Sequence, residues 1–485
     1  MDNKLVEIEI QDVYSELTEF IKDRQTKVNF LLGSNLTNED YVAFREFSKT
    51  ISQSESSFYL NDDLLYKGFF GDNIELAKID DLNSSDAIVV WAEDLKEKLP
   101  VLYLRIRQAV KNGVKLVVFG HTNETLSDIA DVFYGKDMVS ENFEILKDLS
   151  KMKEINNLVV GKNITAILGK STPYQSDESV TKLFEFLNSN ANSKVLNAYS
   201  KGNTYGAFQT LENLKGLNDF VNDISKDNTD LLFIVGADPI GRSVYSNQIK
   251  SIIKSIDTVV TLDNFNHETS ELSDYVVPIS STLGEKEGTF TNIEFRTSRI
   301  DKLVPSPGQT VSDWEFITSL MNFAELTVET NSLEDLNEKA YENLDSSLSP
   351  VFANLDKPSN LDGMVNASKP KISSSDNNLN EAKFFTGEKL YGDSATERHS
   401  DSISLLGSKK YIEVSEGVVE KFNLTSGKCT LIQDELEVTV RYEVNKSFPN
   451  DLIYIPTNRR ELNKFDFSRE IMIIPSQVKE ALNVN

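Results

Sequence analysis

Cysteine and histidine are scarce in this chain of 485 residues. The one cysteine is Cys429, and the three histidines are His121, His267 and His399. An iron–sulfur cluster takes about four cysteine ligands, so a chain with one thiol holds no such cluster, and it has no internal disulfide framework. The CxxC, HExxH and related spacings of zinc sites are also missing. We therefore expect no metal centre with ligands from this chain.

Basic residues and long apolar runs are also in short supply. The chain has 76 acidic and 50 basic side chains, a formal net charge of −26. Phosphate contacts need clustered lysine and arginine, which argues against nucleic acid or an anionic membrane surface as a direct partner. No apolar run approaches the roughly 20 residues of a membrane-spanning helix, and the first ten residues, MDNKLVEIEI, lack the layout of a signal peptide. We expect a cytoplasmic chain with no membrane span of its own.

What the chain does contain is a series of short, β-branched apolar runs that end at glycine or a polar turn. Nearly uninterrupted runs of this kind are typical of strands buried on both faces of a sheet. A helix is predicted between two of them at 100–113, where Leu102, Ile106 and Ala109 lie on one face. Strands that alternate with helices predict a parallel, doubly wound sheet. The runs are KVNFLLG (27–33), DAIVVW (86–91), VKLVVFG (114–120), NITAILG (163–169), DLLFIVG (230–236) and DTVVTLD (257–263).

The strand–helix pattern occurs twice, which predicts an α/β fold with two Rossmann-like parallel-sheet domains, at 1–155 and 156–330. Residues 331–385 predict one polar helix followed by a low-complexity linker rich in serine, asparagine, lysine and proline. Residues 386–485 contain short β-like segments separated by glycine, asparagine and proline. They predict a small, shortened C-terminal β-barrel domain.

Two short patterns contain parts of catalytic motifs. Gly169-Lys170-Ser171 matches the end of a phosphate-binding loop, but Ile164 stands where the first glycine of that loop belongs, so a strand-to-helix turn is favoured. His267 lies near Glu268 and Asp274, as a base and its orienting carboxylate would. No serine or cysteine nucleophile is identifiable by spacing, however, and the same run suits the start of a helix.

A third pattern, VGADPIGRS at 235–243, follows a predicted strand. The strand ends at Gly236, and Asp238 begins an Asp-Pro turn. Ligands of parallel sheets bind at the carboxyl ends of the strands, which supports a ligand role, although Asp-Pro is also an ordinary turn former. Cys429 lies in a β-like stretch and is interpreted as a small buried apolar residue rather than a nucleophile.

Taken together, these segments resemble the molybdopterin oxidoreductase superfamily, and more narrowly the large G-type subunit of NADH–quinone oxidoreductase, respiratory complex I. The resemblance covers most of the chain and is weakest at 330–400. Residues 258–317 carry its most specific part, with an aspartate–phenylalanine pair, a Glu-Thr helix start, a Val-Val-Pro strand, Glu-Lys-Glu-Gly-Thr-Phe-Thr-Asn and an Asp-Trp-Glu helix start. Residues 86–120 and 231–243 are similar to two further strand–helix units of the family.

The chain also departs from the family. The G-type subunit normally begins with a cysteine-rich portion that holds iron–sulfur clusters, and this chain resembles the cluster-free remainder. Where the family usually has Glu-Gly-Arg-x-Gln, residues 294–298 are Glu-Phe-Arg-Thr-Ser. Phenylalanine in place of glycine removes room for the backbone to approach a ligand, and the amide that could bond a pterin edge is gone. The resemblance places the contacts of any bound cofactor on Gly236, Asp238, Asp263, Glu287, Gly288, Asn292 and Arg296.

We interpret these seven residues as a vestigial cofactor loop, with no catalytic residue, no metal ligand and no molybdopterin in this chain. The resemblance then implies a non-catalytic peripheral-arm subunit of a complex I-like enzyme at the cytoplasmic face of the cell inner membrane. Iron–sulfur clusters and flavin are expected in partner subunits, including a separate cluster-bearing chain, and the electron donor is NADH, ferredoxin or flavodoxin. Two alternatives stay open, a molybdopterin guanine dinucleotide-dependent oxidoreductase and a free-standing acidic adaptor.

Overall fold

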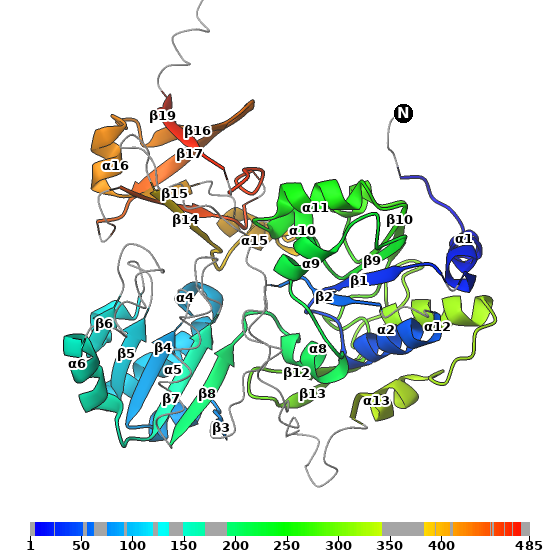
Figure 1. Cartoon of the computed structure of the whole chain (residues 1–485), viewed down its shortest axis with the longest axis horizontal. Coiled ribbons are helices and arrows are strands. Elements are labelled where there is room, and N and C mark those ends of the chain that lie inside the picture. The colour runs from blue at the N-terminus through cyan, green and yellow to red at the C-terminus, as the bar shows by residue number, and fades with distance from the viewer. Residues whose placement is uncertain are drawn as a thin grey trace, which may run out of the picture. The chain divides into compact units, whose positions relative to one another are not determined.

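The chain folds into two compact units, each built on a parallel β-sheet (Figure 1). The first unit draws on residues 1–69, 201–240 and 248–368, and the second on residues 70–200, 241–247 and 369–485. The computed structural model describes residues 5–23, 25–51, 56–62, 75–91, 95–119, 125–134, 149–169, 192–341, 383–392, 394–407, 411–446, 448, 451–459, 461–467 and 469–476.

The first unit contains a five-stranded sheet in the order β11-β10-β9-β1-β2, and each pairing is parallel. β9 and β1 lie side by side in the middle of the sheet. β2 lies beyond β1, and β10 and then β11 lie beyond β9. The two halves of such a sheet place their crossover helices on opposite faces. Accordingly, α2 lies on one face and α11 on the other (Figure 1). The strands are β1 (Val28–Leu32), β2 (Phe58–Leu60), β9 (Leu231–Val235), β10 (Thr258–Asp263) and β11 (Tyr275–Pro278).

A row of phenylalanines crosses the middle of this sheet. Phe30 in β1 is in register with Phe58 in β2 and Phe233 in β9, and its ring stacks on theirs at centroid distances of 5.0 and 5.5 Å. Phe44 and Phe47 of α2 pack on Phe30, with ring centroids at 5.8 and 6.1 Å. Burying several aromatic rings contributes a few kcal/mol each, on the order of 2–3. The apolar strand predicted at 27–33 is thus the centre of the core.

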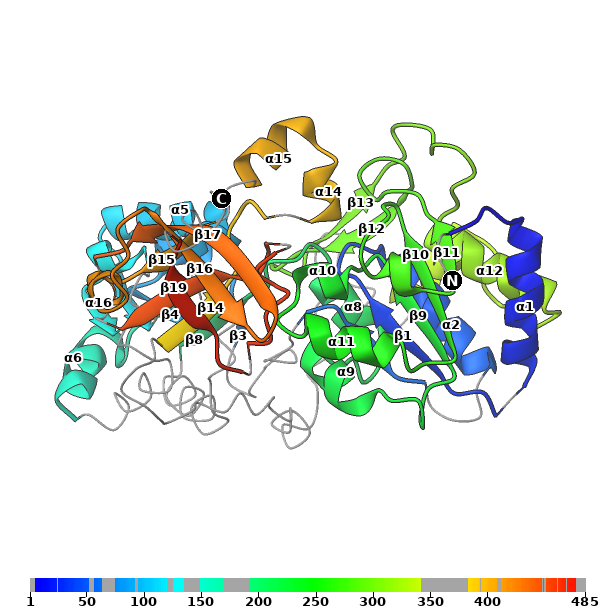
Figure 2. The same cartoon turned by 90° about the horizontal axis from the view of Figure 1, so that it is seen from above.

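The first unit also contains helices, including the parts of α10 and α11 outside residues 241–247, and a hairpin that follows β11 in the chain. Helix α1 packs on α12, where Tyr14 meets Phe316 at a ring distance of 5.5 Å (Figure 2). The helices are α1 (Ile10–Lys22), α2 (Asn38–Ile51), α8 (Thr204–Thr210), α9 (Leu217–Asp223), α10 (Pro239–Arg242), α11 (Ser246–Ile253), α12 (Asp313–Phe323) and α13 (Leu333–Tyr341), with a 3-10 turn at Ser270–Leu272. The hairpin pairs β12 (Gly288–Thr291) with β13 (Thr297–Ile300).

The second unit contains a six-stranded parallel sheet in the order β3-β8-β7-β4-β5-β6. Its central strands are buried along their whole length, and the predicted helix begins at Pro100 with Leu102, Ile106 and Ala109 buried. The elements are β3 (Glu75–Leu76), α3 (Asp81–Ser84), β4 (Ala87–Trp91), α4 (Leu95–Lys98), α5 (Pro100–Lys111), β5 (Lys115–Phe119), a 3-10 turn (Ser127–Ile129), β6 (Val132–Tyr134), α6 (Leu149–Val159), β7 (Ile164–Gly169) and β8 (Ser193–Ala198).

The C-terminal part of the second unit forms a mixed six-stranded sheet in the order β14-β18-β15-β17-β16-β19. Its alternating strands bury one face, as in β17, and α16 contributes Val418 to that core. A β-rich C-terminal part is confirmed, but as a mixed sheet with β14 and β19 at its edges rather than the predicted β-barrel, among the described strands. Its elements are β14 (Lys383–Gly387), α14 (Ala395–Arg398), α15 (Asp401–Gly407), β15 (Tyr411–Val414), α16 (Glu416–Lys421), β16 (Lys428–Gln433), β17 (Leu436–Val444), β18 (Leu452–Pro456) and β19 (Met472–Pro475).

The α/β class and the parallel sheets are confirmed, but the sheets do not divide at residue 155, where the sequence predicts a domain boundary. β1 and β2 pair with strands after residue 230, whereas β7 and β8 pair with strands before residue 120. Parallel neighbours need not be consecutive in the chain, because each pair is joined by a long crossover. The predicted polar helix corresponds to α13, and the predicted linker lies largely outside the described residues, which omit 342–382.

Candidate functional site

Asp238 and Asp263, two of the predicted site residues, meet at a buried histidine. Asp263 ends β10 and Asp238 lies three residues after β9, so both are at the carboxyl edge of the sheet. His267 is 3% exposed, with Nδ1 3.4 Å from Asp238 Oδ1 and Nε2 3.2 Å from Asp263 Oδ2. Thr269 Oγ1 also donates to Asp238, at 2.7 Å. The fold brings Asp238 and Asp263 together, and the side chain between them is His267.

The carboxylates around His267 shift its protonation equilibrium toward the charged form. Burial by itself lowers the pKa of His267, but the hydrogen bond to Asp263 and the charges of Asp238, Asp263 and Glu268 outweigh it, and the pKa of His267 is raised. The backbone N–H of Ser270 also points at His267 Nδ1, at 3.3 Å, so the ring is held by the protein on the side of Asp238. Asp274, the other carboxylate considered from the sequence, accepts from the backbone N–H of Val259 at 2.8 Å instead.

Gly236 follows β9, next to β1, where the chain runs outward in opposite directions along the sheet. The backbone segments after these two strands touch each other there. Gly33, just after β1, donates its N–H to the carbonyl of Val235 at 2.7 Å. A Cβ built on Gly33 would lie 1.9 Å from the carbonyl oxygen of Gly236, and Gly236 itself has a φ of +58°. The crevice between two such strands is where open parallel sheets usually bind ligands. In this chain the loops after β1 and β9 are in direct contact there.

Gly288 begins the hairpin and lies against the N-terminal end of α2. A Cβ built on Gly288 would meet Thr37 Cγ2 at 2.7 Å and Glu39 Oε2 at 2.8 Å. The next residue, Thr289, donates its N–H and its hydroxyl to the Glu39 carboxylate, both at 2.8 Å. Glu39 is fully buried, and burial raises its pKa despite hydrogen bonds from Asn337 and Thr289. Gly288 is needed because the hairpin approaches the helix so closely.

A network of amides and hydroxyls continues this contact along β12. Asn203 Oδ1 accepts from the N–H of Thr291 at 2.7 Å, and Asn203 Nδ2 donates to Asn38 Oδ1 at 3.0 Å. Asn38 Nδ2 in turn donates to the hydroxyls of Thr289, Thr291 and Tyr341, at 3.1 to 3.3 Å. The polar groups of the hairpin are thus satisfied by α2, by the start of α8 and by α13.

Asn292 and Arg296 form the turn of the hairpin. Asn292 Oδ1 accepts the N–H groups of Glu294 and Arg296 at 2.9 and 3.0 Å, so its side chain shapes the turn. Phe295 adopts a left-handed φ of +58°, and its ring is buried against Tyr205 at a centroid distance of 4.2 Å. The phenylalanine that stands where the family has glycine therefore fills space inside the protein.

Glu287, the last of the seven predicted residues, lies at the surface and pairs with Arg299 at 3.2 Å, with both side chains about half or more exposed. The seven residues therefore divide among different places: the His267 cluster, the closed crevice, the α2 contact, the turn and the surface. Their described polar contacts are made within the chain. They do not fit one pterin-binding surface, so we derive no chemistry through such a cofactor.

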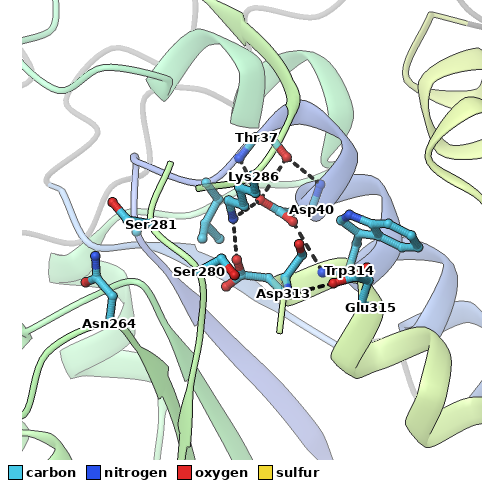
Figure 3. Close-up of polar contacts among 12 residues, drawn as sticks. Thr37, Asp40, Asn264, Ser280, Ser281, Lys286, Asp313, Trp314 and Glu315 are labelled. Atoms are coloured by element: carbon cyan, nitrogen blue, oxygen red, sulfur yellow. Dashed lines mark hydrogen bonds and ion pairs between the residues drawn. The ribbon is translucent and has the colours of Figure 1, made fainter. Parts of the chain in front are cut away.

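The sequence did not predict a fully buried cluster of charged side chains in the first unit (Figure 3). Lys286 Nζ lies 2.6 Å from Asp40 Oδ2 and also contacts Asp313 Oδ2. The side chains are 2%, 0% and 0% exposed for Lys286, Asp40 and Asp313. Asp40 belongs to the first turn of α2 and Asp313 is the first residue of α12. We call these three residues the Lys286 triad.

Both helices that supply the triad begin with side chains that bond the backbone. Asp40 accepts from the N–H and hydroxyl of Thr37, both at 2.8 Å, and from the N–H of Trp314 at 3.2 Å. The positive end of a helix dipole also stabilises a carboxylate in the first turn. In the second helix, Glu315 accepts from the N–H of Ser312 at 2.8 Å (Figure 3).

The positions of these carboxylates do carry a signal in the sequence. Thr37 and Asp40, and likewise Ser312 and Glu315, have the three-residue spacing of a capping box, which predicts two helix starts. Lys286 has no such local signal, because only the fold brings it to residues 40 and 313. A lysine between two glycines, Gly284 and Gly288, is typical of a solvated loop until the tertiary structure is known.

The described residues among the remaining sequence candidates lie in a strand or at the end of a helix. Cys429 is buried in β16, and burial raises the pKa of its thiol to about 12, so it is not a nucleophile at neutral pH. Gly169 ends β7, while Lys170, Ser171 and His121 lie outside the described residues. His399 Nδ1 is 2.8 Å from the carbonyl oxygen of Ala395. Within the ranges that the structure describes, no three histidine, cysteine or acidic side chains gather as a metal site.

The fold places the chain in a broad class, the α/β proteins with doubly wound parallel sheets and an added mixed sheet. The chain belongs to the molybdopterin oxidoreductase family, which matches residues 1–323 of 485. No helix in the described part of the chain has the length and apolar character needed to cross a membrane.

Curated relatives come from several enzymes of this family. The alpha subunit of F420-dependent formate dehydrogenase from Methanocaldococcus jannaschii is 21% identical over 390 residues, 63% of this chain and 58% of the relative. The second G-type subunit of NADH-quinone oxidoreductase from Rhizobium meliloti is 25% identical over 248 residues, 49% of this chain and 28% of the relative. The chain thus spans less than two thirds of either relative.

Among solved structures, acetylene hydratase from Pelobacter acetylenicus resembles the chain with a TM-score of 0.57 and 10% identity, over 93% of this chain and 82% of that one. At this identity the likeness supports the fold alone.

Proposed function

We propose that this chain is a non-catalytic subunit of a complex I-like NADH–quinone oxidoreductase, in which the electron donor is NADH, ferredoxin or flavodoxin. Its role is to scaffold the electron-transfer subunits at the cytoplasmic face of the membrane. The chain itself carries no cofactor, and the iron–sulfur clusters and flavin belong to partner subunits, including a separate cluster-bearing chain. The Rhizobium meliloti relative, a G-type subunit of NADH-quinone oxidoreductase, supports this assembly.

The observation that carries the proposal is the internal use of the candidate cofactor residues. In the loop and hairpin at 284–300, Lys286 binds two carboxyl groups, Thr289 binds Glu39 and Phe295 fills the space beside Tyr205. A loop that received a polar cofactor would leave donors for it, since buried polar groups need partners. These groups already have partners within the first unit. Because these polar groups bond within the protein, the arrangement favours a role of this loop in holding the fold rather than in binding a cofactor.

Electron transfer through the chain itself is disfavoured by its composition. One cysteine is too few for an iron–sulfur cluster, and burial keeps the Cys429 thiol protonated. A subunit without redox groups contributes to such an enzyme by holding other chains in position. The net charge of −26 favours partner surfaces that carry basic residues.

The test is to purify the full chain through an affinity tag from membranes solubilised in a mild detergent. We expect subunits of a quinone-reducing complex, with at least one iron–sulfur chain, to co-purify in fixed ratio. The matched control is the same tagged chain taken through a high-salt wash, which should weaken contacts between charged surfaces. Recovery of the chain alone from both membrane and soluble fractions would contradict the assembly and favour a free-standing adaptor.

The absence of a cofactor is tested on the same material by elemental analysis for molybdenum and tungsten and by fluorescence of released pterin. We expect both to be far below one equivalent per chain. Stoichiometric metal with pterin would overturn the non-catalytic role and favour a molybdopterin guanine dinucleotide-dependent oxidoreductase. The two measurements are independent of co-purification, so either half of the proposal can fail alone.

A further inference from the structure

The Lys286 triad has an unbalanced charge in a site closed to water. One ammonium group faces two carboxyl groups, and all three side chains are at most 2% exposed. If both carboxyl groups are ionised, the buried cluster carries a net charge of −1. An uncompensated charge in such surroundings is costly, on the order of several kcal/mol, unless a proton neutralises it. The geometry of the two carboxyl groups indicates which one takes that proton.

Hydrogen-bond donors are shared unequally between the two carboxyl groups. Asp40 receives the N–H and hydroxyl of Thr37, the N–H of Trp314 and Lys286 Nζ. Asp313 receives Lys286 Nζ on Oδ2 only, and its buried Oδ1 has no hydrogen-bond partner among the described residues. An ionised oxygen without a donor loses its hydration and gains nothing in return, whereas a neutral carboxyl loses less. The proton therefore belongs on Asp313.

The other titratable groups around the triad do not supply the missing charge. From α2 they are Tyr41, whose hydroxyl donates to the carbonyl of Gly33, and Glu39, which faces Thr289. From α12 it is Glu315, which accepts from Ser312, and in the loop of Lys286 it is Glu285, which accepts from the N–H of Ser281. These four groups are acidic or neutral. Burial and the charge of Asp40 raise the pKa of Asp313 to about 7, although Lys286 lowers it.

The triad is also the point at which the hairpin is fastened. Lys286 comes two residues before β12, and its two partners belong to the starts of α2 and α12. Further along β12, contacts with Glu39 and Asn38 join the same hairpin to the same end of α2, and a contact with Asn203 joins it to the start of α8. If the hairpin lifts away, Asp313 regains water and ionises with an ordinary acid pKa. Docking of the hairpin and protonation of Asp313 are therefore thermodynamically linked.

We propose that Asp313 is a proton-dependent latch that holds the β12–β13 hairpin against the N-terminal ends of α2 and α12. The hairpin is held most tightly when Asp313 is neutral. Its attachment weakens as pH rises from the range of an exposed aspartate toward neutrality, and it levels off once Asp313 is ionised in the docked state as well. This latch is independent of the proposed function, because it depends only on contacts within the first unit.

Amide hydrogen exchange, read by mass spectrometry on the full chain, tests the latch. After correction for intrinsic exchange rates, protection of peptides within 286–300 should fall about tenfold between about pH 6 and pH 8. In Asp313→Asn, which mimics the neutral carboxyl, the same peptides should keep the higher protection at both pH values. The matched control is Glu287→Gln, which removes one negative charge from the exposed neighbour of Lys286 and should retain the tenfold change.

Two results would overturn the latch. One is equal corrected protection of 286–300 at both pH values in the unmodified chain, and the other is a full tenfold change that persists in Asp313→Asn. If that variant fails to fold, the unmodified chain still decides the matter. Peptides from β16 and β17 in the second unit serve as the internal reference, and a pH effect of the same size there would show that the change is not specific to the hairpin.

Discussion

Phe295 packs a large side chain into the turn of the β12–β13 hairpin. It has a left-handed φ of +58°, a conformation that costs a residue with a side chain about 1–2 kcal/mol and costs glycine almost nothing. Its ring is nonetheless retained, 5% exposed for the whole residue and 4.2 Å from the ring of Tyr205. Burial of the ring offsets the backbone cost. Position 295 is therefore filled by a packed ring, where the resemblance leads us to expect a glycine.

This balance predicts an unusual order of stability for two truncations of Phe295. Phe295→Ala loses the ring and keeps the strained backbone, at a cost of about 3–5 kcal/mol, while Phe295→Gly should be less destabilised by about 1 kcal/mol. Urea denaturation followed by circular dichroism measures the difference. At Phe290, which has an ordinary φ in β12, the same pair should show the usual order with alanine more stable. Greater stability of Phe295→Ala than of Phe295→Gly would contradict the strain argument.

Some of the site could be predicted from single residues and some could not. Phe295 and Ser298 depart from the glycine and amide that the resemblance leads us to expect, and this departure predicts a vestigial loop. That the ring turns inward onto Tyr205 is not visible, because the two residues are far apart in the chain. The same holds for His267, whose partners Asp238 and Asp263 replace the sequence candidates Glu268 and Asp274 only after β9 and β10 are placed side by side.

At the scale of elements, the most informative contact is the close packing of the β12–β13 hairpin against the start of α2. Gly288 makes it possible, since a Cβ there would lie 2.7 and 2.8 Å from two atoms of Thr37. Gly288→Ala should cost about 1–3 kcal/mol and lower the hydrogen-exchange protection of 288–300. Gly202→Ala is the matched control, because its nearest neighbour would be 3.6 Å away, an ordinary contact. Equal stability of the two variants would mean that the hairpin does not need the close approach.

The elements themselves were largely predictable, while their neighbours were not. All six predicted apolar runs are strands, from β1 to β10, and the helix predicted from Pro100 is α5. A buried apolar run shows that a strand has neighbours on both sides, but it does not identify them. The capping-box spacings at Thr37 and Ser312 likewise predict where α2 and α12 begin, but not that Lys286 joins the two helix starts.

At the scale of the whole molecule, the chain builds its two parallel sheets from interleaved segments. β1 and β2 belong to a sheet that is completed only after residue 230, whereas β3 to β8 form the other sheet in between. A prediction that follows the order of the sequence places a domain boundary near residue 155, because it assigns each strand to its nearest neighbours in the chain. Contacts between strands about 200 residues apart, such as β1 with β9, depend on long loop closures that local patterns do not encode.

The single cysteine allows the stability of the second unit to be followed separately. Cys429 is fully buried in the core of the C-terminal sheet, between β17 and β19, and its thiol pKa is raised to about 12 by burial. Both the lack of access and the lack of thiolate slow its reaction with a thiol reagent. Labelling in native buffer near neutral pH should therefore be at least about 10³-fold slower than in the urea-unfolded chain, because it requires opening of the sheet.

The labelling rate should rise in parallel with loss of the C-terminal sheet as urea increases, since the chain has no other thiol to contribute a signal. Raising the pH by one unit in native buffer should leave the opening step unchanged and increase only the reaction of the opened form, by up to about tenfold while that thiol stays below its ordinary pKa. Native labelling as fast as in the unfolded chain would show that the sheet does not bury Cys429 in solution. A slow native rate with a sharp urea transition would instead show that the C-terminal sheet opens cooperatively, as its continuous core of β15, β16, β17 and β18 side chains requires.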